Sequence, residues 1–120
     1  MNGLDVFEYR GEGYMPQLAF GAWRVAYLNY APRFTKEGCT YLERHMETDE
    51  VFVLLKGTAT LYIGLDNPAP VELEQGKIYN VRRTVWHAVT CSPDASVLIV
   101  ENEDTSRENS EYHDLVAPLP

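Results

Sequence analysis

Residues 43–57, which read ERHMETDEVFVLLKG, decide the fold class of this 120-residue chain. The stretch predicts the end of one strand, a turn, and a second strand that begins near Glu50. Because successive side chains of a strand point to opposite faces, Glu43 and His45 are expected to face the same way. We expect them to converge with Glu50 on one cavity across the short connection.

A second stretch, GKIYNVRRTVWH at residues 76–87, places His87 after a turn and before an apolar strand. Short runs rich in β-branched and aromatic residues recur along the chain between turn residues, and no segment has a convincing helical period. Such spacing predicts an antiparallel sandwich or barrel. The predicted strands are 18–30, 38–45, 51–56, 59–63, 71–74, 78–81, 87–91 and 97–101.

Two imidazoles and one carboxylate around a cation leave positions open for water or substrate, as in Mn, Fe, Ni and Zn sites. A carboxylate buried without a partner is costly, so an inward Glu50 predicts a cation or an arginine beside it. Alternatively, His45 and His87 are hydrogen-bonded core residues.

The first stretch resembles the first motif of the cupin superfamily, in which a His-x-His pair precedes a glutamate and then a glycine. His45, Glu50 and Gly57 stand at the spacing of this motif, and Glu43 occupies the place of its first histidine. In the second cupin motif, Gly76 and His87 match. Three positions of that motif differ, where its proline, glycine and asparagine are replaced by Arg82, Thr84 and Cys91.

The resemblance implies an all-β fold, a cupin-type double-stranded β-helix or jelly-roll barrel, in one domain at 1–120. We expect the barrel core at about 18–102, an N-terminal edge segment at 1–17 and an acidic, solvated tail at 103–120. Single-domain cupins often form dimers, so a homodimer is also expected.

The resemblance further implies that His45, Glu50 and His87 hold a divalent metal ion. Glu43 would be a fourth ligand or a general base, and Tyr41, on the same strand face, would orient the substrate. Alternatively, Glu43 pairs with an arginine and the metal position stays vacant; the candidate partners are Arg24, Arg82 and Arg83.

The predicted function is binding or conversion of a small polar metabolite, a sugar or a hydroxy or keto acid, at this metal. The alternative is a non-catalytic ligand-binding or sensing module without metal. The fold alone does not choose between them, because cupins have many activities.

The formal net charge of −8 argues against nucleic-acid and anionic-membrane partners, which require clustered Lys and Arg. The longest apolar run, 51–55, is far too short for a membrane span, and the first residues do not resemble a secretory signal. These features predict a cytoplasmic protein. Cys39 and Cys91, the two cysteines, are expected to stay reduced as small core or pocket-lining residues.

Overall fold

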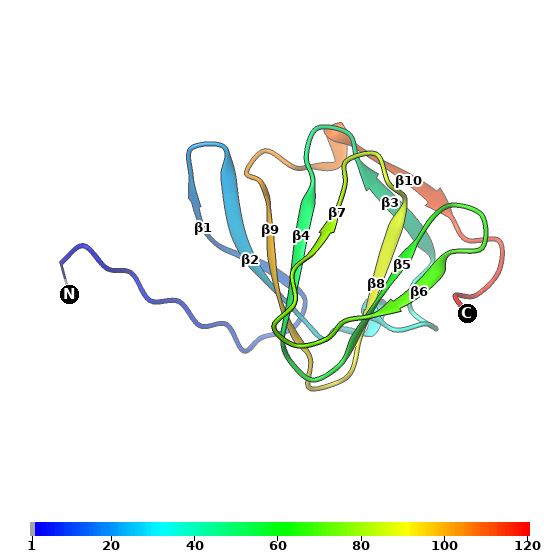
Figure 1. Ribbon diagram of the computed structural model, residues 1–120, viewed down its shortest axis with the longest axis horizontal. Helices are drawn as coiled ribbons and strands as arrows, with labels where there is room; N and C mark the ends of the chain where they lie inside the picture. The colour runs from blue at the N-terminus through cyan, green and yellow to red at the C-terminus, as the bar shows by residue number, and fades with distance from the viewer. Residues whose placement is uncertain (1) are drawn as a thin grey trace.

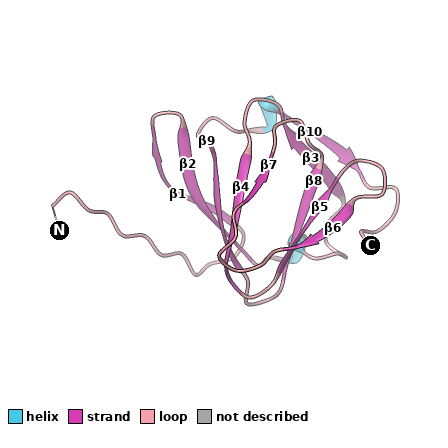
Figure 2. Cartoon of the chain, viewed as in Figure 1, coloured by secondary structure: helices cyan, strands magenta, loops and turns pink. Residues whose placement is uncertain are grey.

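The computed structural model describes residues 2–120, in which ten strands form two five-stranded antiparallel sheets (Figures 1 and 2). The first sheet has the order β1-β2-β9-β4-β7 and the second β10-β3-β8-β5-β6. The strands are β1 (Tyr14–Phe20), β2 (Trp23–Asn29), β3 (Tyr41–His45), β4 (Glu50–Lys56), β5 (Ala59–Ile63), β6 (Ala69–Glu72), β7 (Tyr79–Val81), β8 (His87–Cys91), β9 (Ser96–Asn102) and β10 (Ser110–Asp114). Two single-turn 3-10 helices, η1 (Pro32–Phe34) and η2 (Arg107–Asn109), are the helical segments of the described chain. The all-β jelly-roll prediction is confirmed.

One predicted strand is wrong, because residues 18–30 form parts of two strands. β1 and β2 make a hairpin in which Phe20 pairs with Trp23. Gly21 turns the chain with a φ of 59°, a left-handed conformation that glycine adopts without steric cost. The turn was not predicted from the sequence because apolar residues flank it on both sides.

The predicted acidic tail is also wrong in part, because β10 lies within residues 103–120 and belongs to the second sheet. It pairs with β3 from Ser110 opposite His45 to Asp114 opposite Tyr41. The side chains of β10 are mostly exposed, so the strand is acidic without burying charge. The sheets therefore extend beyond the predicted core of 18–102 at both ends.

The apolar core lies between the sheets and ends at the polar cluster predicted from the sequence. Phe52, Val97 and Ile99 are fully buried there, and Cys91 joins them as a reduced core residue. The ring centroid of Phe52 lies 6.1 Å from that of His87, so the apolar packing adjoins the candidate ligands.

The segment before β1 runs away from the barrel as an extended arm (Figure 1). Its base is fixed by Asn29, whose side-chain amide donates to the carbonyl oxygens of Tyr9 and Gly11 at 3.0 and 2.8 Å. Among residues 2–120, no helix has the length and apolar character needed to cross a membrane.

Candidate metal centre

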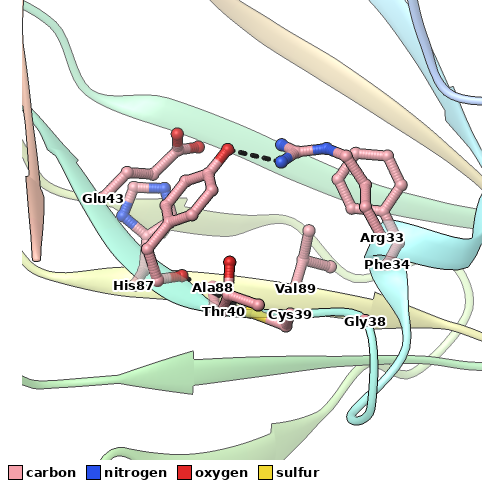
Figure 3. Close-up of a pocket in the computed structure, with 10 residues that line it drawn as sticks. Arg33, Phe34, Gly38, Cys39, Thr40, Glu43, His87, Ala88 and Val89 are labelled. Carbon is pink, nitrogen blue, oxygen red and sulfur yellow. Dashed lines mark hydrogen bonds between the residues drawn. The ribbon is translucent and has the colours of Figure 1, made fainter. Parts of the chain in front are cut away.

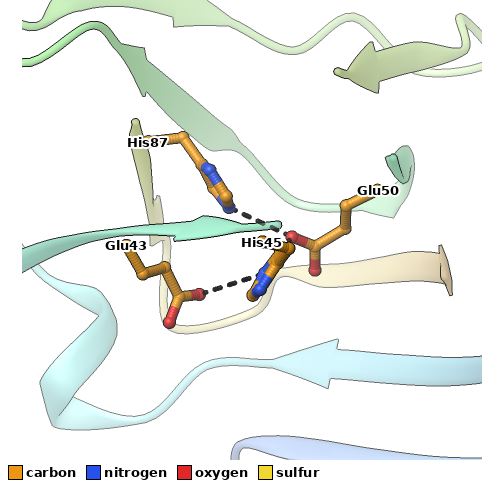
Figure 4. A group of neighbouring side chains, drawn as sticks. All are labelled: Glu43, His45, Glu50 and His87. Carbon is orange, nitrogen blue, oxygen red and sulfur yellow. Dashed lines mark hydrogen bonds and ion pairs between the residues drawn. The ribbon is translucent and has the colours of Figure 1, made fainter. Parts of the chain in front are cut away.

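Four side chains predicted from the sequence meet at one end of the barrel (Figure 4). β3 carries Glu43 and His45, while Glu50 and His87 are the first residues of β4 and β8. Glu43 and His87 are direct neighbours in the β3–β8 register. One ligand atom from each of the four residues lies within 4.8 Å of the others. The structure therefore brings together the whole predicted ligand set.

Glu50 is the shared centre of this cluster. Its Oε1 lies 3.1 Å from Nε2 of His45 and 3.0 Å from Nε2 of His87, and all three side chains are buried. Glu43 lies at the edge, with its Oε1 3.8 Å from Nε2 of His45, and it is partly exposed. Glu50 thus points inward, and Glu43 is the member of the cluster that solvent reaches.

The hydrogen bonds of His87 determine which of its nitrogens faces the cluster. Its Nδ1 lies 3.0 Å from the carbonyl oxygen of Val85, which can only accept, so Nδ1 carries the proton. In the neutral ring, Nε2 then directs a lone pair at the carboxylate of Glu50. A proton or a metal ion must lie between these groups to make the contact favourable.

In the metal-free protein the contact shifts the pKa values of both partners. Burial lowers the pKa of His87, but the hydrogen bond and charge of Glu50 outweigh burial and raise it to about 8. Burial likewise raises the pKa of Glu50, but its hydrogen bonds to His45 and His87 bring it below the usual value. The pKa of His45 is raised in the same way, against burial, by Glu50. The cluster therefore attracts positive charge.

Ser110 contacts the cluster from β10 and was missed in the sequence. Its Oγ lies 2.8 Å from Nδ1 of His45 and fixes the orientation of that ring. Its contact with the cluster was not predicted, because Ser110 lies in the segment expected to be a solvated tail. Its partner is 65 residues away in the sequence.

The predicted pairing of Glu43 with an arginine is not found among the described residues. Arg24 pairs with Glu101, at 3.1 Å between Nη2 and Oε2. Arg82 and Arg83 are exposed and make no ion pair in the described chain. Glu43 therefore remains available to a ligand or a metal.

Tyr41 lines a small cavity of about 40 Å³. Glu43, His87 and Cys39 line the same cavity (Figure 3). The hydroxyl of Tyr41 accepts a hydrogen bond from Arg33, a residue that the sequence did not single out. Arg33 and Glu43 also line a larger cavity of about 260 Å³, which reaches His45 and Glu50. Tyr41 and Glu43 thus lie on the side from which a ligand would reach the cluster.

Glu101, the last residue of the predicted strand 97–101, also lines the larger cavity. It is 6% exposed, and its Oε2 accepts from Tyr14 and Arg24, while Oε1 has no hydrogen-bond partner within residues 2–120. Burial and the nearby charge of Glu50 raise its pKa. The alternation of Val97, Ile99 and Glu101 along β9 was the signal that it faces inward.

The donor set fits a divalent cation. Two imidazole nitrogens and two carboxylates are ligands for borderline divalent ions, and the carboxylates balance their charge. The protonated Nδ1 of His87 leaves Nε2 free to coordinate. The fold and site together define a jelly-roll barrel with a candidate metal centre at one end.

The comparisons with known proteins identify this barrel as a cupin fold. A Streptomyces PAC13 structure solved with uridine matches with a TM-score of 0.65 and 7% identity over 91% of this chain and 85% of that one. A cupin-2 domain protein from Shewanella frigidimarina matches with a TM-score of 0.61 and 17% identity over 78% and 85%. QdtA, a sugar 3,4-ketoisomerase from Thermoanaerobacterium thermosaccharolyticum in complex with TDP, matches with a TM-score of 0.61. The identity is 15% over 77% of this chain and 67% of that one. No protein-family model and no curated protein matches the sequence.

Proposed function

We propose that this protein binds a divalent metal ion through His45, Glu50, His87 and Glu43, and that it acts on a small polar metabolite at that ion. The observation that carries the proposal is the position of Glu50, buried between two Nε2 atoms at 3.1 and 3.0 Å. Such a carboxylate needs a positive charge beside it, which a divalent ion would supply, and the cluster adjoins a cavity large enough for a small molecule.

The metal would supply Lewis acidity to a bound oxygen. With two carboxylates among its ligands, its charge is largely balanced, which favours redox-neutral chemistry on a sugar or a hydroxy or keto acid. Mn, Fe, Ni and Zn all suit mixed nitrogen and oxygen ligands.

Glu43 and Tyr41 have separate roles in this proposal. Glu43 is the least buried of the four acidic and imidazole groups and lines both cavities, so it acts as the fourth ligand or as a general base. Tyr41 is held by Arg33 on the same wall and orients the substrate. The QdtA structure, which contains TDP, supports the use of this barrel for a small molecule.

Elemental analysis of protein purified without an affinity tag tests the metal directly. We expect stoichiometric Mn, Fe, Ni or Zn in the wild type and its loss in His87→Ala. His113→Ala is the matched control, because His113 is exposed, packs edge-to-face against Trp86 and is not one of the four clustered residues. Absence of metal from wild-type protein grown with all four metals would contradict the proposal.

The second candidate is a non-catalytic binding or sensing module without metal. The raised pKa of His87, about 8, favours it, since a proton can then take the place of the metal against Glu50. This candidate predicts metal-free protein that still binds a small ligand in the 260 Å³ cavity.

A homodimer is part of the proposal. Apolar side chains are exposed on the N-terminal arm and on the β1–β2 hairpin, among them Val6, Phe7, Phe20 and Trp23. Exposed apolar groups of this kind are typical of protein interfaces. Sedimentation analysis of the full chain and of Phe20→Ser checks the dimer. The cytoplasmic location stays a prediction.

A further inference from the structure

Two arginines and two tyrosines form a continuous rim where the two cavities adjoin. Arg33, Tyr112 and Arg107 line the larger cavity, and Tyr41 lines the smaller one beside Arg33. The guanidinium of Arg33 lies 5.5 Å from the ring centroid of Tyr41, and the Tyr41 ring lies 5.5 Å from that of Tyr112. The guanidinium of Arg107 lies 4.9 Å from the ring of Tyr112. Stacking on aromatic rings holds a guanidinium in place while leaving its N–H groups free.

The third arginine of this cavity, Arg24, differs from the other two in its hydrogen bonds. It donates to Tyr14, Glu101 and the carbonyl oxygens of Glu103 and Thr105, so its donors are largely used. Arg33 donates once, to Tyr41. Among residues 2–120, Arg107 makes no side-chain hydrogen bond, and neither Arg33 nor Arg107 makes an ion pair.

The charges of the cavity can be paired group by group. Arg24 balances Glu101, and a divalent ion in the proposed centre balances Glu43 and Glu50. Arg33 and Arg107 then remain as two positive charges that have no acidic partner in the part of the chain that the structure describes. The cavity is therefore positive in a protein whose net charge is −8. A rim of this kind is suited to an anionic group, which accepts charge-assisted and bidentate hydrogen bonds from guanidinium.

We propose that the rim formed by Arg33, Tyr41, Tyr112 and Arg107 binds the carboxylate or phosphate of a small anionic ligand and presents the rest of the ligand to the cluster around Glu50. The proposal rests on the proposed function for the charge of the metal. The rim itself contains no metal ligand, so the anion-binding proposal and the metal-binding proposal can be contradicted independently. The anion-binding proposal narrows the expected class of ligand from small polar metabolites in general to small anions.

Isothermal titration of the full-length, metal-analysed protein with four probes tests the proposal. Succinate and inorganic phosphate are the anions, succinamide is the neutral analogue of succinate, and chloride measures non-specific screening. We expect at least one of the two anions to bind and succinamide not to bind. Comparison of succinate with phosphate shows which anionic group the rim prefers.

Variants then locate the binding. Arg33→Gln and Arg107→Gln should each weaken anion binding about tenfold, the usual size of one lost charge-assisted hydrogen bond. Arg33→Lys should recover only part of the loss, because lysine lacks the planar fork of donors. Arg82→Gln, which removes an exposed arginine outside this cavity, should bind like the wild type. Metal content should be unchanged in all four variants.

Three results would overturn the proposal. They are no binding of either anion, equal binding of succinate and succinamide, and unchanged anion affinity in both arginine-to-glutamine variants. The last result would mean that anions bind at the metal alone. If the wild type lacks metal yet binds anions through Arg33 and Arg107, the rim stands and the proposed metal function fails.

Discussion

His87 and Glu50 lie 3.0 Å apart between Nε2 and Oε1, although they are 37 residues apart in the sequence and belong to different sheets. Glu50 begins β4 of the first sheet, whereas the other three members of the cluster lie on β3 and β8 of the second. The cluster therefore exists only when the two sheets close on each other. Any cation held there connects the sheets.

Metal should for this reason stabilise the fold. A ligand that binds only the native state adds RT ln(1 + [L]/Kd), about 2.7 kcal/mol when its concentration is 100 times Kd. We expect thermal unfolding of chelator-treated protein to shift upward on addition of Mn, Ni or Zn. The same addition to His87→Ala should leave the unfolding temperature unchanged, and an equal shift in both proteins would place the metal elsewhere.

The metal-free protein should lose stability as the pH rises from about 6.5 to about 8. The pKa of His87 is raised from 6.5 to about 8 in the fold, so its contribution is full below 6.5 and disappears as the pH passes 8. The pKa of Glu50 is lowered from 4.5, so its contribution is full above 4.5 and disappears as the pH falls. Both shifts describe one interaction and are counted once.

Urea unfolding at several pH values measures this effect. The free energy of unfolding of chelator-treated protein should be highest between 4.5 and 6.5 and fall by about 2 kcal/mol toward pH 8 and above. With metal the trend should reverse, because ligation requires neutral imidazoles and releases protons. A flat profile in the metal-free protein would show that Glu50 and His87 do not form the pair.

Ser110→Ala should weaken metal binding without removing it. Ser110 fixes the ring of His45 through Nδ1 at 2.8 Å, and loss of such an outer contact typically costs 10- to 100-fold in affinity, by the usual range for these contacts. Competition with a chromophoric chelator measures the change. Ser106→Ala is the control, because Ser106 lines the same cavity but its hydroxyl caps η2. Equal effects of both substitutions would mean that Ser110 acts only through the fold.

Sequence reasoning brought Glu43, His45 and Glu50 together because their relative positions depend on local rules. Strand alternation places Glu43 and His45 on one face, and the short connection brings Glu50 back to them. His87 was located by its resemblance to a family motif, since nothing local relates β8 to β3. Its contact with Glu50 depends on closure of the barrel.

The residues that were missed depend on long-range pairing. Ser110 and Arg107 lie in an acidic segment whose composition suggested solvated coil, and only its pairing with β3 reveals a strand. Arg33 lies on a 3-10 turn with no periodic pattern, and it reaches Tyr41 through a contact that propensity does not predict.

Thr84→Gly should stabilise the protein by about 1 kcal/mol. Thr84 has a φ of 70°, a left-handed conformation that is unfavourable for a β-branched residue, and its N–H donates to the carbonyl oxygen of His45 at 2.7 Å. Glycine removes the steric cost and keeps this hydrogen bond. Thr40→Gly is the control and should destabilise, because the described chain shows no positive φ at Thr40. Destabilisation by Thr84→Gly would show that the threonine side chain has a stabilising role.

Leu119→Ala should destabilise the fold by roughly 2–4 kcal/mol, the cost of removing a buried leucine side chain. After β10 the chain returns across the second sheet, and Leu119 is 5% exposed in a cluster with Leu42, Tyr62 and Ala88. Val116, three residues earlier in the same segment, is 99% exposed, so Val116→Ala should change the free energy of unfolding by less than about 0.5 kcal/mol. Urea unfolding of the two variants measures the difference.

The packing of Leu119 holds the segment that follows β10, and β10 carries Ser110. Leu119→Ala should therefore also weaken metal binding. Equal stability of the two variants would mean that the last residues do not pack on the barrel.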